Sequence, residues 1–488
     1  MPDIIKKCVT RYIVPFYFDN QNKGYAKILN YFRNQYNYSK LGLPKDSHWI
    51  ERGFWENYKS DNAKQTEMDI YTYLLNMLKE CPENSDNYET NLGVSLVLKT
   101  NGSLLDLQYR PTKSEDAINF KCTDLGILIF RNGIGFVWYD IKFSKEPDVQ
   151  TYVKFQSEFK ELARMHQVSF YQKKGKNNYE LFYIGNWLTN IINSEQMKIQ
   201  FWAEQQIKSG LGKHIIPDKA ILFQYLFVNN ENKQFRNELA FEVANGYDFK
   251  YQPPNYLNDE VYEPFGNTGF YASKAGISCI VSNNDTNEIF FMDNFRERFI
   301  RDYFFIYVML LYQTYSCEYY SKLLMILPAD AKAFGKNEKY IEFLETIDSQ
   351  INLFLVKSIY ETVSNVQHQN EIYQYIKSRL CIENNIKSLT IGLEALRGIE
   401  KEKRKEEQSE KEKYRREKVE EKDRALNKGL IVFGFLVVIS AVIDALNLVD
   451  WFTTNFSKIN LGHVVFMGVI TLLTVYMFII LIVNTKNT

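Results

Sequence analysis

The chain has 488 residues, with 59 basic and 59 acidic side chains and a formal net charge of zero at pH 7. This balance gives no reason to expect duplex nucleic acid as the main partner. Aromatic residues make up 15% of the chain, which excludes a disordered composition, and the length allows two or three domains.

Cysteine and histidine usage argues against a metal centre and a disulfide framework. The six cysteines are scattered without a C-x-x-C pair, so we expect reduced packing thiols in the cytosol. The five histidines show no ligand spacing, which gives no reason to expect a zinc site. The chain has no P-loop, dinucleotide-binding glycine motif or nucleophile elbow, so the sequence predicts neither an enzyme nor a resident cofactor.

Residues 1–292 are expected to form a cytosolic α+β sensor domain, with a sheet packed against helices. The apolar stretch Tyr12–Phe18 predicts a strand, and Pro15 favours a sheet edge because proline cannot donate to a strand ladder. Apolar residues recur at helical spacing within Met68–Lys79.

Two Asn-Gly dipeptides predict β-hairpins, because Asn-Gly readily adopts the positive φ angles of a tight turn. They are Asn101-Gly102, between Val94–Leu98 and Leu104–Leu107, and Asn132-Gly133, between Gly126–Phe130 and Phe136–Phe143. An amphipathic helix is predicted next, at Val153–Arg164.

A second β-rich block is predicted beyond residue 220. Its expected strand pairs are Ile221–Val228 with Glu238–Val243, and Gly276–Val281 with Glu288–Met292. Each pair surrounds a polar turn, which favours antiparallel structure. Hairpins followed by a helix thus occur more than once, without a recognisable sequence repeat.

Residues 293–371 are predicted to be a helical core region. Asp293 or Asn294 is expected to cap a helix that starts at Phe295. The apolar stretch Tyr303–Tyr315 fits either a third membrane span or a buried helix, and only about 15 uncharged residues are too few to cross a bilayer comfortably. A buried core helix ending near Pro328 is therefore favoured.

Residues 372–428 are predicted to be a long stalk helix, continuous from Ile372 through Leu448. It begins with a heptad seam formed by Ile382, Ile386, Leu389, Leu393 and Leu396. Glu400–Lys428 then contains 10 acidic and 12 basic residues, many at i,i+4 spacing, which favours a solvated helix over a basic nucleic-acid-binding tail. The rare apolar residues Val419, Leu426 and Phe433 lie seven apart and hint at one face kept for a partner helix.

Two apolar runs predict a transmembrane helical hairpin at the C-terminal end. They are Gly429–Leu448, with 20 residues, and His463–Val483, with 21, joined by an outer loop at 449–462 and followed by a tail at 484–488. Twenty helical residues span about 30 Å, the thickness of a bilayer's hydrocarbon core. Basic residues flank both spans on one side, which predicts a multi-pass plasma (inner) membrane protein with cytoplasmic termini. Because Met1–Thr10 lacks an apolar core, no cleavable signal peptide is expected.

Three polar residues in the first span form the candidate site. Ser440, Asp444 and Asn447 fall at i, i+4 and i+7, so they share one helix face. One reading is that this face meets water, a pore or a partner; the other is that Asp444 reaches the outer interface and Asn447 ends the helix. Two spans cannot enclose an aqueous path, so a pore requires a homo-oligomer whose first spans provide rings of Ser440, Asp444 and Asn447.

This layout of sensor domain, stalk helix and C-terminal hairpin resembles the CorA superfamily of divalent-cation channels, which are typically homopentamers lined by the first span. The family motif is Gly-Met-Asn, and the corresponding stretch here is Ala445-Leu446-Asn447, which retains only the Asn. The divergent soluble domain looks more like the CorA-like membrane effectors of type III CRISPR systems. That resemblance implies an antiviral role, a nucleotide second messenger such as an AMP conjugate of S-adenosylmethionine as ligand, and no direct nucleic acid contact.

Two other functions stay open. A housekeeping Mg²⁺ transporter would bind divalent cations but is disfavoured by the missing Gly-Met. A membrane-tethered interaction protein or enzyme would use the hairpin only as an anchor.

Overall fold

The computed structural model describes residues 4–18, 24–34, 44, 46–51, 70–71, 74–75, 77–78, 91–111, 117–162, 170–174, 178–192, 197–202, 218–248, 251, 253–283, 288–325, 337–455, 465–466, 468–473 and 475–476. The chain divides into two compact units, Met1–Ile399 (unit 1) and Glu400–Thr488 (unit 2). Unit 1 is a mixed α+β domain, as predicted, and unit 2 contains most of one long apolar helix.

Among the described residues of unit 1, the strands form one mixed sheet in the order β11-β12-β10-β1-β6-β5-β4-β7-β8. Strand β3 pairs with β2 and β5, and β9 pairs with β1. All pairs are antiparallel except β10 with β12. The strands are β1 (Ile5–Tyr17), β2 (His48–Glu51), β3 (Gly93–Lys99), β4 (Leu105–Tyr109), β5 (Ile118–Phe130), β6 (Ile134–Phe143), β7 (Phe170–Lys173), β8 (Tyr179–Leu181), β9 (Gln200–Phe201), β10 (Ile221–Val228), β11 (Thr268–Ser273) and β12 (Gly276–Ser282).

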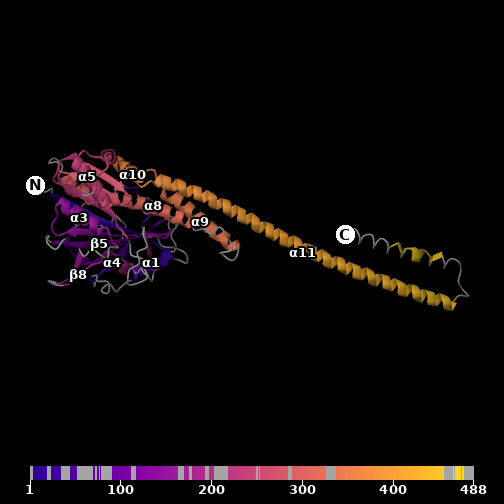
Figure 1. Ribbon diagram of the computed structural model, residues 1–488. Helices are drawn as coiled ribbons and strands as arrows, with labels where there is room; N and C mark the ends of the chain where they lie inside the picture. The colour runs from indigo at the N-terminus through magenta and orange to yellow at the C-terminus, as the bar shows by residue number, and fades with distance from the viewer. Residues whose placement is uncertain are drawn as a thin grey trace. The chain divides into compact units, whose positions relative to one another are not determined.

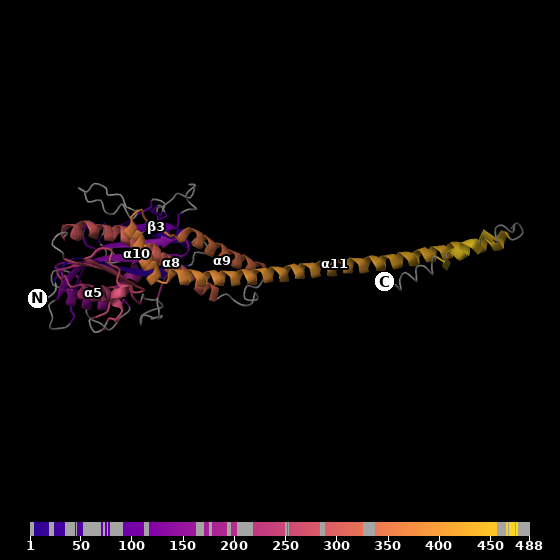
Figure 2. The same cartoon turned by 90° about the horizontal axis from the view of Figure 1, so that it is seen from above.

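Helices cover both faces of this sheet, and Figures 1 and 2 show α8 and α9 beside the first turns of α11. The helices are α1 (Gly24–Arg33), α3 (Val149–Phe159), α4 (Ile184–Ile191), α5 (Lys233–Asn245), α6 (Leu257–Glu260), the π-helix η4 (Phe290–Phe295), α7 (Arg296–Arg298), the π-helix η5 (Phe299–Tyr303), α8 (Phe304–Met325), α9 (Asn337–Ser358), α10 (Gln367–Arg379) and α11 (Ile382–Asn455).

Strand β1 is central, so the sheet-edge position predicted from Pro15 is wrong. Pairing with β10 extends only as far as Ile13, and pairing with β9 starts at Phe16. The Pro15 carbonyl accepts a hydrogen bond from the Trp202 N–H on this side, at 3.0 Å. Because the nitrogen and oxygen of a strand residue point the same way, the Pro15 nitrogen faces the gap between β10 and β9, where no ladder donor is needed.

One of the two predicted hairpins forms. Strands β5 and β6 pair around Asn132-Gly133, and Gly133 has a φ of 94°. The first predicted hairpin is wrong, because β3 and β4 do not pair with each other. Both pair with the 13-residue strand β5, β3 along Gly126–Phe130 and β4 along Ile118–Cys122. Asn101-Gly102 therefore carries the chain along one side of a long strand instead of reversing it into a hairpin.

The second predicted β block is half correct. Strands β10 and β12 form, but Glu238–Val243 lies within α5, and Glu288–Met292 is helical. Helix α5 is capped at both ends. At its N-terminus the Asn232 side chain accepts a hydrogen bond from the Phe235 N–H, and at its C-terminus Gly246 adopts a left-handed conformation with a φ of 60°. It connects β10 to the edge hairpin of β11 and β12, which makes the β10–β12 pair parallel.

Two hydrophobic clusters divide the core of unit 1 between the faces of the sheet. On β1, Val9 and Ile13 point into the cluster shared with α8, α9, α10 and the beginning of α11. Tyr12, Val14 and Phe16 point into the cluster shared with α1, α3, α4 and α5. This alternation follows the two-residue period of a strand covered on both sides. Helix α3 starts and ends earlier than the predicted Val153–Arg164.

Helix α8 confirms the predicted buried helix, since Phe304 through Thr314 are all buried. The predicted cap at Asp293 or Asn294 is wrong, because the helix is already running at Glu288 and continues through the π-helical turns η4 and η5. These wide turns place aromatic rings on the sheet, such as Phe299, which stacks on Phe223 with centroids 4.4 Å apart. Pro328 and half of the residues of Met68–Lys79 lie outside the described residues.

The predicted continuous helix from Ile372 is interrupted at its beginning. Ile372 belongs to α10, which ends at Arg379, and Cys381 adopts a left-handed conformation with a φ of 54° before α11 begins. The heptad seam is buried in unit 1 at Ile382, Leu389, Leu393 and Leu396. Helix α11 then runs unbroken to Asn455, past the predicted end of the first span at Leu448.

Candidate functional site

The predicted polar face lies entirely on α11. Ser440, Asp444 and Asn447 are helical and exposed, and their spacing places them on one side of the helix. Phe433 and Val437 continue that side and are 66% and 52% exposed. The structure thus supports the shared face, and the role of these residues in lining a pore stays a prediction.

The apolar part of α11 has the length and composition of a membrane span. Among the described residues, α11 is the only helix that is long and apolar enough to cross a membrane. Its most apolar stretch of 18 residues has a mean hydropathy of 2.5, and none of this stretch is buried. Large side chains such as Leu430 and Phe435 are 59% and 67% exposed. A contiguous apolar surface of this extent requires a lipid or protein cover.

Only parts of the predicted hairpin are described. The outer loop predicted at 449–462 begins as helix, because α11 includes Asp450 and Trp451 and ends at Asn455. Within the second predicted span, residues 465–466, 468–473 and 475–476 are helical, and the others lie outside the described residues. The second membrane crossing, the position of the termini and the multi-pass topology therefore stay predictions.

The charged segment of α11 forms the predicted ion pairs along its own length. Lys411 pairs with Glu407, Arg416 lies 3.8 Å from Glu412, and Arg424 lies 3.7 Å from Glu420. These exposed pairs contribute about 0.3–0.5 kcal/mol each to the helix. The charges are thus engaged along the helix itself, as expected for a solvated helix.

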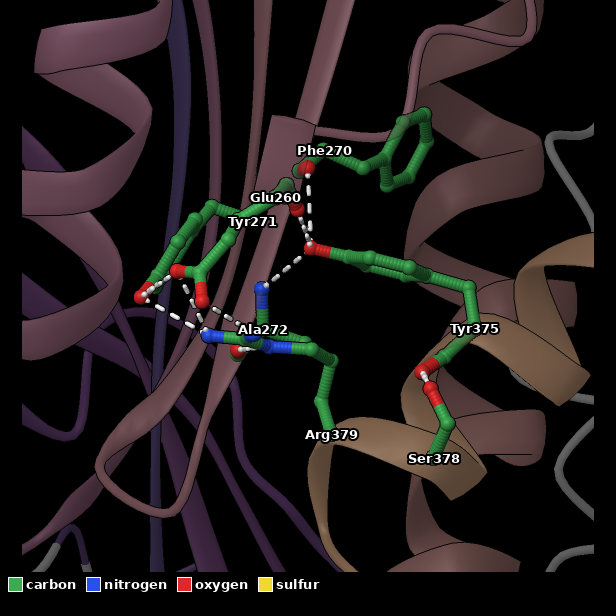
Figure 3. A network of polar contacts seen from close by, with 7 residues as sticks. All are labelled: Glu260, Phe270, Tyr271, Ala272, Tyr375, Ser378 and Arg379. Atoms are coloured by element: carbon green, nitrogen blue, oxygen red, sulfur yellow. Dashed lines mark hydrogen bonds and ion pairs between the residues drawn. The ribbon is translucent and has the colours of Figure 1, made fainter. Parts of the chain in front are cut away.

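A polar cluster at the end of α10, which the sequence did not indicate, joins that helix to strand β11. The guanidinium of Arg379 donates from Nη2 to Glu260 Oε2 at 3.0 Å and to the Tyr271 hydroxyl at 3.0 Å. Its Nη1 lies 2.8 Å from Glu260 Oε1, and its Nε donates to the Ala272 carbonyl at 3.1 Å. Figure 3 shows these contacts converging on one side of β11.

Tyr375, one turn earlier on α10, completes the cluster. Its hydroxyl lies 2.8 Å from the Glu260 carbonyl oxygen and 3.2 Å from the Phe270 carbonyl oxygen, and it accepts from the Ala272 N–H at 3.2 Å (Figure 3). Burial raises the pKa of this hydroxyl above its ordinary value, so it stays a neutral donor and acceptor. Burial acts to lower the pKa of Arg379, but the hydrogen bond to Glu260 together with the charges of Tyr271, Tyr375 and Glu260 outweighs it and leaves the pKa raised.

Sequence reasoning missed this cluster because β11 itself was not predicted. Tyr375 and Arg379 stand at i and i+4, a spacing that places them on one helix face, but a tyrosine and an arginine at that spacing are common on surface helices. Their role depends on an edge strand about 105 residues earlier in the chain.

A small hollow between α3, β7 and α4, with a volume of about 20 Å³, has room for about one water molecule. It is lined by Glu158, Phe159, Glu161, Leu162, Phe170, Phe182, Tyr183 and Ile184. Its two carboxylates disfavour a phosphate. The pocket therefore lends no support to a nucleotide ligand.

In the described part of the chain, no group of three or more His, Cys, Asp or Glu side chains is placed to hold a metal ion. The described cysteines Cys8, Cys122, Cys279, Cys317 and Cys381 are all free. Comparisons with protein families, curated proteins and solved structures found no match. The resemblance to the CorA superfamily therefore stays a prediction from the layout of the sequence.

Proposed function

We propose that this protein is an oligomeric, CorA-like membrane channel or effector whose unit 1 binds a small ligand and controls the apolar part of α11. The observation that carries this proposal is the composition of α11. Its first turns contribute Ile382, Leu389 and Leu393 to the core of unit 1, and the same unbroken helix later presents an apolar run of bilayer length. A displacement of the first turns can therefore be transmitted along a continuous helix to the apolar run.

The need for several copies follows from the polar face. A carboxylate near the centre of a membrane helix costs about 2.5–3.5 kcal/mol on insertion scales. Asp444 lies four residues from the end of the predicted span, so its cost is smaller, but contact with water or with a polar partner still lowers it. Copies of the first span arranged around an axis would turn Ser440, Asp444 and Asn447 toward a shared aqueous path. Rings of carboxylates favour cations, which makes a cation the expected conducted species.

The ligand class rests on the resemblance to the CRISPR-associated effectors. It implies a nucleotide second messenger, an antiviral role, a pentamer, and a location in the plasma membrane with both termini in the cytoplasm. Among the described residues, several surfaces of unit 1 combine aromatic and basic side chains, such as Arg110 beside Tyr171 and Tyr179. Such surfaces suit a nucleobase or phosphate better than the acidic pocket beside α3 does.

Cation release from liposomes containing the full chain tests the proposal. Replacement of both Asp444 and Asn447 by leucine should remove most of the cation flux, because the polar rings are lost. The matched control replaces Val442 and Val449 by leucine, about half a turn away, and should leave the flux unchanged. Equal flux from both variants would contradict the pore-lining role, and a monomer in mild detergent would contradict the oligomeric channel.

A further inference from the structure

Strand β11 lies at the end of the sheet order, so one of its two sides has no further long strand to pair with. On that side, Phe270 exchanges two backbone hydrogen bonds with Tyr262, at 2.9 and 2.8 Å. The next outward-pointing backbone pair belongs to Ala272. Its N–H donates to the Tyr375 hydroxyl, and its C=O accepts from Arg379 Nε (Figure 3). Side chains of α10 thus take the place of a neighbouring strand at Ala272.

The same helix end determines where α11 starts. Only Leu380 and Cys381 separate Arg379 from the first residue of α11. Lys377 on α10 also pairs with Glu383 on α11 at 3.1 Å, which bridges the junction. Lys377 is 8% exposed as a residue, so this pair is partly shielded from water on the α10 side.

The residue at the junction is itself in an unfavourable conformation. Cys381 has a φ of 54°, a left-handed conformation that costs a residue with a side chain about 1–2 kcal/mol. Backbone strain of this kind persists where the surroundings hold it in place. Here those surroundings are the contacts of α10 on one side and the buried first turns of α11 on the other.

We propose that Tyr375 and Arg379 form a clamp on the edge of β11, and that its release pivots the beginning of α11 about Cys381. This inference rests on the proposed function, since it names the element of unit 1 that moves α11. The clamp is suited to two states because most of its contacts are hydrogen bonds to backbone groups and to Glu260, which water can replace at a partly exposed site. Arg379 and Glu260 have side chains 26% and 22% exposed.

Coupling across the clamp is measured by hydrogen exchange of the full chain in lipid nanodiscs. In the double variant Arg379→Ala with Tyr375→Phe, amide exchange should rise at least about tenfold in Thr268–Ser273 and also in the first turns of α11, residues 382–396. Exchange in β6, at the centre of the sheet, should not change. The single variant Tyr375→Phe removes one hydroxyl only and should give a smaller rise in the same two segments, which keeps the test valid if the double variant is poorly folded.

The matched control is Arg397→Ala. Arg397 also pairs with a carboxylate, Asp348 at 2.7 Å, and both residues lie in unit 1, but this pair joins α11 to α9. It should leave exchange in β11 unchanged. A reversed pair, Arg379→Glu with Glu260→Arg, should restore part of the protection lost in Arg379→Glu alone.

Two results would overturn the clamp. One is a rise in β11 exchange without any rise in residues 382–396, and the other is unchanged exchange in β11. Cation flux from liposomes separates this inference from the function on which it rests. Coupled exchange without flux in any variant would retain the clamp and refute the channel, whereas flux with uncoupled exchange would refute the clamp alone.

Discussion

The guanidinium carbon of Arg11 lies 4.0 Å from the centroid of the Phe304 ring. Arg11 belongs to the central strand β1, and Phe304 is the first residue of the core helix α8, so this contact joins the sheet to the helix. Arg11 is 1% exposed and donates two hydrogen bonds to Asp140, at 2.6 and 2.7 Å. A buried cation is thus both paired and packed against an aromatic ring.

The first prediction concerns this pair. Arg11→Ala should lower the free energy of unfolding by about 3–5 kcal/mol, because it leaves Asp140 without its partner in a largely buried site. Arg11→Lys should lose less, since an ammonium keeps the charge but not the two parallel hydrogen bonds. Chemical denaturation of the full chain in detergent, followed by tryptophan fluorescence, measures both.

Arg397→Ala is the control for the first prediction. Its partner Asp348 lies at 2.7 Å, but the Arg397 side chain is 50% exposed, and exposed pairs contribute about 0–1 kcal/mol. Similar losses for Arg11→Ala and Arg397→Ala would show that burial of the Arg11 pair has no special importance.

The second prediction concerns Gly126 in β5. A Cβ atom at this position would lie 2.2 Å from Cε2 of the Trp138 ring, which packs across it from β6. Gly126→Ala should therefore destabilise unit 1 by about 1–3 kcal/mol through overpacking. Gly398→Ala is the matched control, because no atom lies within 4 Å of its Cβ position and alanine favours the helix by up to about 1 kcal/mol. Thermal unfolding should show a lower Tm for the first variant and an equal or higher Tm for the second; the reverse order would contradict the argument.

Local patterns in the sequence predicted the elements whose stability is local. The charged segment of α11, the buried helix α8 and the β5–β6 hairpin each carry their own periodicity or turn residues, and each forms. Errors occurred where tertiary contacts override a local pattern. The stretch Glu238–Val243 looks like a strand, but the Asn232 cap and Gly246 stop make it the end of a helix packed on β10, β11 and β12.

Pairing between distant segments was the part least visible in the sequence. Strand β3 looked like the hairpin partner of β4, but the long strand β5 pairs with both. For the candidate site, the spacing of Ser440, Asp444 and Asn447 was sufficient to predict their shared face, because only helix geometry is involved. The clamp could not be predicted in this way, since Ala272 and Arg379 meet only through the folded sheet.

The third prediction concerns the pH dependence of stability. Burial, together with the nearby Glu238 and Asp248 carboxylates, raises the pKa of Glu242 to about 8. The folded state therefore binds a proton that the unfolded state releases above its ordinary pKa of about 4.5, so stability falls as the pH rises from about 5 to about 8 and then levels off. Glu242→Gln should remove about 2 kcal/mol of this decline, because the amide cannot ionise.

Denaturation midpoints of the full chain at pH 5.5, 7 and 8.5 measure this effect. Glu242 is 5% exposed, and among the described residues its Oε2 atom has no hydrogen-bond partner, so ionisation is not compensated. Glu238→Gln should remove a smaller part of the same decline, because the Glu238 carboxylate is one of the two charges that raise the pKa of Glu242. Parallel pH profiles for the original chain and Glu242→Gln would contradict the assignment.

The fourth prediction concerns Cys381, between α10 and α11. Its φ of 54° lies in the region that only glycine adopts without steric cost. Cys381→Gly should raise the free energy of unfolding by about 0.5–1 kcal/mol, after allowance for the greater backbone entropy of glycine in the unfolded chain. Cys381→Val should lower it, because a β-branched side chain fits this conformation worst.

Chemical denaturation compares the two, with Cys317→Ala at a buried helical site as a control for loss of a thiol. A glycine variant less stable than the valine variant would show that Cys381 carries no backbone strain.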